Sequence, residues 1–564
     1  MIAAAGAFLE RYPELAVYLA VAFGHLIGRL SIRGISLGAV TGSLFAGLLI
    51  GQIADVAVPG MAKSILFMLF LFGIGYSVGP QFLPSLRREG MKPVLLAVVV
   101  AVTGLVAATF IAKILDLDAG YAAGLLSGAL TESPAIGTAT EAISRLPLPE
   151  DQRALLTSHV AVADAVCYLF GVVFVVLFLS EIAPRLVKID LREEAQALER
   201  SFGIESTRPN LFSAWRRIEL RAFRLGDDAP SVGLTIAAAE KRVPDARVFV
   251  LRIRRGADII EATPDLLLLA DDIVAVSGPR KTLVALLGNL AAEVEDQALL
   301  DVPVSLAQVR VTNRAAIGET LGDLANAEWA RGLYLQKVTR GGQELPIAPR
   351  IVLDRGDILH LVGPDGVVQS AASNLGVVIG PVAETDFVTL GIGIFVGGMI
   401  GVLLTFPIAG MQLSLSSSVG VLLAGLAVGH LRTYYPLLGG IPDAGVQLMT
   451  SFGLAAFVGM VGLHAGPIFF TALADVGLGL VMGGAVVTAA PMIVGLIFGR
   501  FVLRMNPILL LGALAGAQTV TAAMAAVQSR SSSFVAVLGY TPAYPIGHVL
   551  LTAWGTVIVE LMAP

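Results

Sequence analysis

Charge is scarce in this 564-residue sequence. Asp, Glu, Lys and Arg make up 14% of the residues, against about 25% in an average soluble domain. Hydrophobic residues make up 56%, and the mean hydropathy is +0.81. Such a chain cannot shield its apolar surface from water without a bilayer, which excludes an ordinary soluble protein. The N-terminal stretch MIAAAGAFLERYPEL also lacks the basic start and cleavage pattern of a signal peptide. We therefore expect the first membrane helix to direct insertion.

Cysteine is nearly absent as well. The single cysteine, Cys167, excludes an intrachain disulfide and a cysteine metal cluster. The net charge of −5 is mild, and no basic or aromatic-basic stripe indicates a nucleic-acid partner. The sequence contains no H-E-x-x-H, G-x-G-x-x-G or nucleotide-binding loop. We expect a protein that is not an enzyme and that carries neither a cofactor nor a metal.

Apolar segments of membrane-spanning character stand in two groups on either side of a charged middle. A membrane helix needs about 20 mostly apolar residues. The first group covers 14–31, 36–53, 61–79, 92–115 and 154–181; the second covers 386–405, 412–430, 444–470, 474–499 and 540–561. Two further stretches, 119–145 and 507–530, have polar centres. Because each arm of 119–145 has only about 12 residues, too few to span, we expect re-entrant hairpins.

The two groups repeat each other. IGYSVGPQF at 74–82 matches VGLHAGPIF at 461–469, and the order of matches is kept over three separate segments. The matching positions are glycines and hydroxyl-bearing residues: Gly42, Gly47 and Gly51 match Gly420, Gly425 and Gly429, and Gly124, Gly128, Thr131 and Ser133 match Gly512, Gly516, Thr519 and Thr521. Asp164-Ala165 is paired with Tyr544-Pro545. With about five crossings in each half the repeats are inverted, the usual construction of secondary transporters.

The charged middle is duplicated too. RRGADIIEATPDLLLLADDIVAVSGP at 254–279 matches TRGGQELPIAPRIVLDRGDILHLVGP at 339–364. The runs RVFVLRI and DIVAVSG read as strands, and KTLVALLGNLAAEV reads as a closing helix. We therefore predict an N-terminal membrane repeat over 1–185, a linker over 186–209, small α+β modules over 210–295 and 301–380, and a C-terminal membrane repeat over 385–564.

The positive charges set the expected orientation, because Lys and Arg mark the cytoplasmic side. They gather in alternate loops, at Arg29, Arg33, Arg87, Arg88 and Lys92. If 119–145 crosses the membrane, the modules lie outside; if it dips in and returns, segment 154–181 delivers them to the cytoplasm. Arg432, Arg500, Arg504 and Arg530 agree with the second interpretation. It places both termini outside a bacterial inner membrane and the modules in the cytoplasm.

The tips of the two hairpins, TESP and QTVT, carry the candidate substrate site. A returning helix presents free N–H groups and a positive dipole end to an anion, and Pro134 suits its first position. The candidates at the tips are Thr131, Glu132, Ser133, Pro134, Gln518, Thr519 and Thr521. A carboxylate at midplane costs roughly 2.5–3.5 kcal/mol, so Glu132 could hold an ammonium group, a coupled cation or a proton. Asp164, His464 and His548 are further candidates within apolar segments.

These motifs, their second copies and the two modules resemble the aspartate:alanine exchanger family of bacterial antiporters over essentially the whole chain. The modules resemble the TrkA-C domains of potassium-transport regulators. The resemblance implies an inner-membrane exchanger of amino acids or dicarboxylates, such as aspartate for alanine, or succinate. Because paired modules of this type commonly associate, it also implies a homodimer. The Asp164-Ala165 pair departs from Tyr544-Pro545 of the other repeat, which puts a strict aspartate–alanine assignment in doubt.

The sequence thus predicts an α-helical polytopic membrane protein that exchanges a small anionic or zwitterionic substrate by alternating access, with an elevator-like movement. A second interpretation is a ligand-gated channel or a cation-coupled uptake carrier. No TVGYG-type filter is present, and inverted repeats with polar hairpins favour a carrier. The expected partners are membrane lipids and a small-molecule regulator on the central modules. We expect no nucleic-acid partner.

Overall fold

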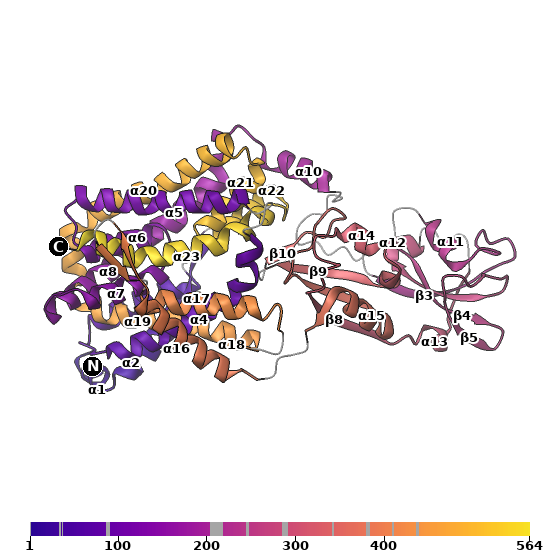
Figure 1. The fold of residues 1–564 in the computed structure, drawn as a ribbon, viewed down its shortest axis with the longest axis horizontal. Helices are drawn as coiled ribbons and strands as arrows, with labels where there is room; N and C mark the ends of the chain where they lie inside the picture. Colours follow the sequence, from indigo (N-terminus) through magenta and orange to yellow (C-terminus); the bar gives the residue numbers. More distant parts are fainter. Residues whose placement is uncertain are drawn as a thin grey trace. The chain divides into compact units, whose positions relative to one another are not determined.

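A computed structural model describes residues 2–32, 35–36, 38–85, 91–202, 218–243, 247–284, 292–340, 343–379, 384–408, 411–414, 416–435 and 439–563. The chain forms two compact units. We call the first, Met1–Ser201 with Arg340–Leu345 and Pro381–Pro564, the membrane unit. We call the second, Phe202–Thr339 with Pro346–Gly380, the central unit. The described chain is thus a helical membrane protein with a sheet-containing part between its two halves in the sequence; Figure 1 shows the helices and the sheets.

Every predicted membrane segment contains a helix. The first half has α2 (Pro13–Gly28), α3 (Ala39–Gly51), α4 (Gly60–Ser85), α5 (Met91–Ile114) and α8 (Glu150–Leu177), preceded by α1 (Ile2–Arg11). The second half has α16 (Phe387–Leu403), α17 (Ser417–Leu431), α18 (Asp443–Gln447) continued by α19 (Gly453–Ala465), α20 (Phe469–Ile497) and α23 (Val537–Met562). Five stretches are long and apolar enough to cross a membrane: Gly60–Pro80, Met91–Ile114, Glu150–Leu186, Asp443–Val502 and Val537–Met562.

Two boundaries differ from the prediction. The second helix of each half is short, 13 residues in α3 and 15 in α17, because a β-hairpin takes up part of each predicted segment. These hairpins are β1 (Ser31–Ile32) with β2 (Ile35–Ser36) and β13 (Thr405–Ile408) with β14 (Met411–Ser414). The break expected between 470 and 474 lies earlier, at the tight turn Gly466–Ile468. Pro467 lacks an N–H and cannot continue a regular helix from Gly466.

The helix packing of one half is repeated in the other. Helix α4 of the first half packs on α17 of the second, and α19 of the second half packs on α3 of the first. A Cβ on Gly75 of α4 would lie 2.4 Å from the carbonyl oxygen of Leu422 in α17. A Cβ on Gly462 of α19 would lie 2.5 Å from that of Leu44 in α3. No side chain fits at such distances, so only glycine allows the two backbones to meet. The matching glycines of the sequence are therefore close helix contacts, and they confirm the repeat.

Each polar stretch is a helical hairpin: α6 (Ala119–Ala129) with α7 (Pro134–Arg145), and α21 (Pro507–Ala517) with α22 (Thr521–Ser531). Gly120, Gly124 and Gly128 approach the carbonyls of Leu156, Val160 and Asp164 in the same order, so α6 runs parallel to α8. Because α8 begins at Glu150, soon after α7 ends, α7 must return to the end where α6 began. The first hairpin is therefore re-entrant. Gly512 and Gly516 meet the carbonyls of Ala536 and Tyr540 in the same way.

The two halves run in opposite directions. Glu132 at the start of α7 contacts His548 of α23, whereas Thr138 further along α7 contacts Thr552 and Thr556. Helix α7 is thus parallel to α23 and, because it reverses the chain, antiparallel to α8. The equivalent helices α8 and α23 are therefore antiparallel, as inverted repeats require. Both termini lie at one end of the membrane unit, on its left in Figure 1.

The middle of the chain contains two sheets with the same strand order. The first sheet, β5-β4-β6-β3-β7, uses β3 (Ile218–Arg224), β4 (Phe249–Arg255), β5 (Asp258–Glu261), β6 (Ile273–Pro279) and β7 (Ala292–Val294). The second, β10-β9-β11-β8-β12, uses β8 (Val304–Val311), β9 (Tyr334–Arg340), β10 (Gln343–Leu345), β11 (Ile358–Pro364) and β12 (Gly376–Val378). The identical order confirms the predicted duplication.

Two details of the middle differ from expectation. The predicted closing helix over 281–294 ends in strand β7, which pairs with β3, and its residues 285–291 lie outside the described part. The second module has a closing helix, α15 (Asp365–Leu375), before β12. The predicted linker over 186–209 begins with helix α10 (Leu191–Phe202), whose Glu199 accepts a hydrogen bond from Ser533 of the membrane unit. The predicted start of the first module, at 210, also lies outside the described residues.

The two modules pair with each other within the chain. The rings of Phe249 and Tyr334, equivalent residues of β4 and β9, meet edge-on at 5.7 Å. Arg331 of the second module bonds Glu240 of the first, at 2.7 Å between Nη2 and Oε1. Burial raises the pKa of Tyr334 to about 12 and lowers that of Arg247, whose Nη2 donates to Ala325 and Ala330 carbonyls. One chain thus supplies both partners of the module pair.

Candidate functional site

The two hairpins turn in the same way. Thr131 and Thr519, which the repeat makes equivalent, have φ angles of 58° and 57°. A β-branched residue in this left-handed region is strained, and such strain concentrates at functional sites. Around each threonine the turn closes with matching backbone hydrogen bonds, from Glu132 N to Ser127 O at 2.8 Å and from Val520 N to Ala515 O at 3.0 Å. The fold therefore builds one special turn twice.

The two tips meet, as the sequence predicts. The hydroxyl of Thr131 lies 3.3 Å from the carbonyl oxygen of Gln518, to which it donates. The hydroxyl of Thr519 donates to Oε2 of Glu132 at 2.8 Å. Each threonine thus reaches across to the other hairpin: Thr131 bonds a backbone carbonyl there, and Thr519 bonds a side chain.

Glu132 is the centre of a polar cluster. Its side chain is 1% exposed. Besides Thr519, its carboxylate receives Thr552 Oγ1 at 3.0 Å, and Nδ1 of His548 lies 2.8 Å from the same Oε1. Both residues belong to α23, where their spacing of one helical turn puts them on one face. The structure thus brings together Glu132, Thr519 and His548 from the sequence prediction and adds Thr552.

Gln518 lies beneath the second tip with its side-chain amide unsatisfied. The residue is fully buried, and neither Nε2 nor Oε1 has a hydrogen-bond partner among the described residues. Buried polar groups are nearly always paired, and an unpaired amide costs about 1–3 kcal/mol. A donor and an acceptor are therefore available directly below the tip.

Asp164 belongs to the packing of the first hairpin. Its buried carboxylate accepts a hydrogen bond from Ser127 of α6 at 2.6 Å. The close contacts of Gly128 with Asp164 and of Gly516 with Tyr540 make Asp164 equivalent to Tyr540. The predicted pairing of Asp164 with Tyr544 is therefore wrong by one helical turn. Tyr540 in turn lies 3.3 Å from the hydroxyl of Thr521.

The remaining candidates lie in different surroundings. Ser133 is 5% exposed, and Pro134 is the first residue of α7, as predicted. His464 lies in the last turn of α19 and bonds the backbone of Ala154 in α8. In the described part of the chain no hydrogen bond or ion pair joins His464 to the tips. The structure therefore gathers His548, and not His464, into the cluster.

The first hairpin is held against the first turn of α17. Glu141 of α7 accepts hydrogen bonds from the backbone N–H groups of Ser417 at 2.9 Å and Ser418 at 3.0 Å, and from the Ser417 hydroxyl. A carboxylate at a helix N-terminus satisfies free N–H groups and the dipole. Only Ser144 and Arg145 are exposed along the whole of α7.

The second hairpin has an exposed face. Along α22, the exposed residues run from the tip to the base: Thr521, Ala522, Ala525, Ser529 and Arg530. This small and polar face differs from that of α5, which exposes Val98, Val102, Val106 and Phe110 in the manner of a lipid-facing helix. The α22 face is therefore suited to water rather than to lipid.

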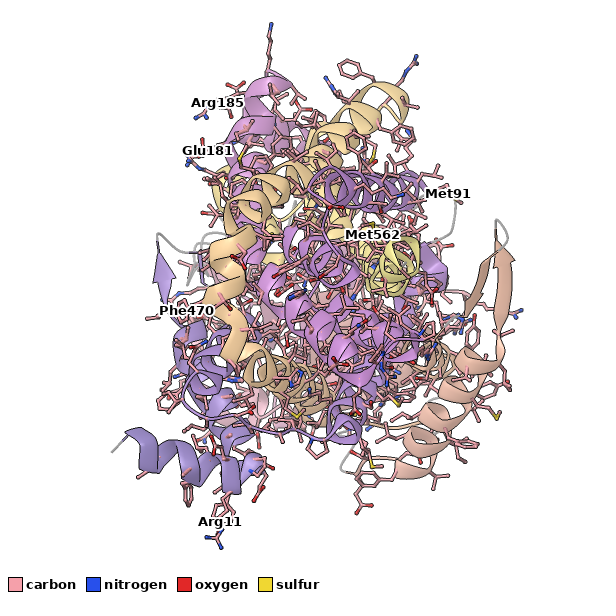
Figure 2. All side chains as sticks on the ribbon, turned by 90° about the vertical axis from the view of Figure 1, so that its left-hand side faces the viewer. Arg11, Met91, Glu181, Arg185, Phe470 and Met562 are labelled. Carbon is pink, nitrogen blue, oxygen red and sulfur yellow. The ribbon has the colours of Figure 1, made fainter. Side chains whose placement is uncertain are left out.

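The base of the second hairpin is tied to other elements. Arg530 forms an ion pair with Glu181, which follows α8 and also bonds Arg185 at 2.9 Å; Figure 2 shows Glu181 and Arg185 side by side at the periphery. Ser533 donates to Glu199 of α10 at 2.5 Å and caps Val535 N. The base of the second hairpin thus lies near the end of α8, and the base of the first hairpin lies near the start of α8.

Sequence reasoning missed several residues of this arrangement: Thr552, Ser127, Tyr540 and Glu141. The first had a detectable signal, because Thr552 follows His548 by one helical turn in an otherwise apolar helix. The role of Glu141 depends on a contact between α7 and α17, which lie far apart in the sequence.

Comparison with protein families identifies the class of this fold. The family described as the predicted permease membrane region matches residues 16–184 and 389–560. The TrkA-C domain matches residues 220–290. The chain belongs to this permease family, the aspartate:alanine exchanger type, with TrkA-C modules between the membrane halves.

Curated relatives agree over nearly the full length. A protein of Bradyrhizobium diazoefficiens is 56% identical over 90% of this chain and 99% of its own. A protein of Bordetella bronchiseptica is 40% identical over 97% of this chain and 96% of its own. A protein of Shewanella oneidensis is 36% identical over 98% of this chain and 99% of its own. Each is described as an uncharacterized transporter, so the chain resembles multi-pass membrane transporters.

Proposed function

We propose that this permease exchanges small carboxylate-bearing solutes across the bacterial inner membrane by alternating access. Amino acids such as aspartate and alanine, and dicarboxylates such as succinate, are the candidate substrates. The observation that carries the proposal is the meeting of two oppositely directed hairpins, with their strained Thr131 and Thr519 turns in contact. The protein acts as a carrier and performs no covalent chemistry.

The second tip offers the anion-binding groups. Helix α22 has 11 residues, and its N-cap, Val520, has no side chain that caps the first turn. Free N–H groups and a positive dipole end therefore lie beside the exposed hydroxyl of Thr521. The unpaired amide of Gln518 lies just below. A carboxylate suits this set of donors, and the amide oxygen of Gln518 adds an acceptor for an ammonium or hydroxyl group.

The different surroundings of the two hairpins support alternating access. Helix α7 is buried and latched to α17 by Glu141, whereas α22 presents a polar face from its tip to its base. In this conformation, the tips are open toward the base of the second hairpin and closed toward the base of the first. The inverted repeat allows the opposite state, in which the two hairpins exchange surroundings. An elevator-like shift of α6, α7, α8 and α21, α22, α23 would achieve the exchange.

The remaining parts take supporting roles in this proposal. The termini lie outside and the central unit in the cytoplasm, as the distribution of Lys and Arg indicates. The central unit regulates transport upon binding a small-molecule ligand, and the protein forms a homodimer. The pairing of both modules within one chain leaves the dimer contact to other surfaces.

Counterflow in proteoliposomes tests the proposal. Vesicles loaded with an unlabelled amino acid or dicarboxylate should accumulate the labelled counterpart transiently for at least one member of a panel. The panel contains aspartate, alanine, glutamate, succinate, fumarate and neutral sugars. Absence of counterflow for every carboxylate, with folded protein, would contradict the proposal.

Matched threonine variants locate the site. Thr521→Val removes a hydroxyl from the exposed tip and should lower counterflow at least about fivefold. Thr140→Val is the control, because its hydroxyl bonds the Ile136 carbonyl of its own helix at 2.7 Å, away from the tip. Equal losses in both variants would argue against a substrate site at the tip.

A further inference from the structure

The carboxylate of Glu132 is buried and has three polar partners. Thr519 donates to one oxygen, while Thr552 and His548 share the other, all within 3.0 Å. Glu132 is 1% exposed and His548 is 7% exposed. An ammonium group or a metal cation would have to displace these partners to reach either oxygen. In the described residues no group of three acidic, cysteine or histidine side chains forms a metal site. The cluster therefore does not suit a cation other than a proton.

The charge of the cluster depends on one proton. No Lys or Arg of the described residues forms an ion pair with Glu132; its charged partner is His548. If the pair holds one proton in total, it is neutral, whether that proton lies on the imidazole as a second N–H or on the carboxyl group. Without that proton, a net negative charge is buried at membrane depth, which is strongly unfavourable. Because the two groups are coupled, the proton is assigned to the pair and not to either residue alone.

We propose that the Glu132–His548 pair is a proton-binding site that loads one proton together with the carboxylate-bearing substrate. This inference rests on the proposed function. Thr519 connects the two sites, because it bonds Glu132 and belongs to the tip that offers the anion site. A substrate carboxylate at the first turn of α22 adds a negative charge beside the pair and favours its protonated state. Substrate and proton therefore bind together and leave together.

Other titratable groups lie near the pair, and their proton binding must be distinguished from that of the pair. The ring of Tyr544 in α23 meets that of His548 edge-on at 5.7 Å and stacks on Tyr540. Tyr168 of α8 interacts electrostatically with Glu132 and with Asp164 of the same helix. Asp164 is the chief competitor, but its carboxylate bonds Ser127 and not the Glu132 cluster. The hairpin helix α6 contributes no acidic or basic residue near the tip, since Ser127 to Leu130 are uncharged.

Proton counting upon substrate binding tests the proposal directly. The full-length protein in detergent and weak buffer is mixed with saturating aspartate or succinate, whichever gives counterflow, while pH is recorded. The expected result is proton uptake that rises with pH toward about one proton per bound substrate, because the free protein loses the proton of the pair as the pH rises and substrate restores it. His548→Gln and Glu132→Gln each remove one member of the pair and should reduce the uptake to near zero. Any residual binding is measured by calorimetry in the same samples.

A pH gradient gives the second measurement. In counterflow, an acidic exterior should speed the uptake of labelled substrate several-fold in the native protein and not in His548→Gln. Counterflow with no proton uptake and no response to the gradient would overturn the proton site while leaving the exchanger proposal intact. Loss of proton uptake in Asp164→Asn, with retention in His548→Gln, would also overturn it. Lack of counterflow with every carboxylate contradicts the exchanger proposal instead.

Discussion

The two hairpins of the membrane unit are copies of one another in different surroundings. Both turn at a left-handed threonine, and both pack their first helix along a glycine-lined contact. Their second helices differ: α7 is buried and bonded through Glu141 to α17, whereas α22 exposes a small, polar face. Identical turns in unequal surroundings are what a carrier fixed in one of its two end states should contain. The comparison therefore says more about mechanism than either hairpin does alone.

The difference between the hairpins also follows from their sequences. Position 132 holds a glutamate in the first tip, and the equivalent position in the second holds Val520. Position 141 holds a glutamate, and its equivalent in the second hairpin is Ser529. The first hairpin thus keeps both carboxylates, one for the tip cluster and one for the latch. The two hairpins have the same backbone conformation, but only the first has carboxylates at these two positions.

The largest effect is expected from breaking the link between the tips. Thr519→Val removes a hydroxyl donor from the buried carboxylate of Glu132, which costs about 1–3 kcal/mol. Exchange should fall at least about fivefold, since 1.4 kcal/mol corresponds to tenfold. Glu132→Gln should impair exchange similarly. Counterflow rates and size-exclusion profiles of both variants check this. Normal exchange in both purified variants would remove the tip contact from the mechanism.

A second effect concerns access to the tips. In a Cys167→Ser background, Ser133→Cys and Thr521→Cys are labelled separately with a membrane-impermeant thiol reagent. Without substrate, Thr521→Cys should react several-fold faster, and only from the side of the second hairpin base, because Thr521 is exposed and Ser133 is 5% exposed. Substrate should change the balance. Labelling of both positions from one side under every condition, in variants that still exchange, would contradict alternating access.

A third and smaller effect is expected at the latch. Glu141→Gln keeps a hydrogen-bond acceptor for Ser417 and Ser418 but removes the charge from the helix N-terminus. A charge in this position contributes about 0.3–1 kcal/mol. The rate of Ser133→Cys labelling from the first hairpin side should therefore rise roughly two- to fivefold. Glu150→Gln, at the exposed start of α8, is the control. Equal rates in Glu141→Gln and its parent would show that the contact does not restrain the hairpin.

Much of this arrangement could be predicted from the sequence, because the repeats and the polar centres of 119–145 and 507–530 can be recognised from short stretches of residues. The glycine matches identify the helix contacts, and TESP and QTVT identify the tips. The pairing of Asp164 with Tyr544 was wrong because it aligned the two helices by local sequence similarity around Tyr544-Pro545. The helix contacts shift that alignment by one helical turn. Gly128 and Gly516 fix the register of the helices through contacts that only the folded chain contains. For the same reason, the bond between His548 and Glu132 and the capping of α17 by Glu141 could not be predicted.

The smallest effect is expected at the base of the second hairpin. Where α17 holds the first hairpin, the linker helix α10 holds the second, through the bond from Ser533 to Glu199. Glu199 is 6% exposed and also lies beyond the reach of the tip cluster, so it acts on the hairpin and not on substrate. Glu199→Ala removes this bond, and the buried hydroxyl of Ser533 keeps only Val535 N as a partner. Amide hydrogen exchange over 528–536 should become a few-fold faster, while counterflow changes less than about threefold. Glu193→Ala, at an exposed position of α10, is the control and should change neither. If exchange over 528–536 is unaltered in Glu199→Ala, helix α10 does not restrain the second hairpin, and regulation by the central unit must act through another contact.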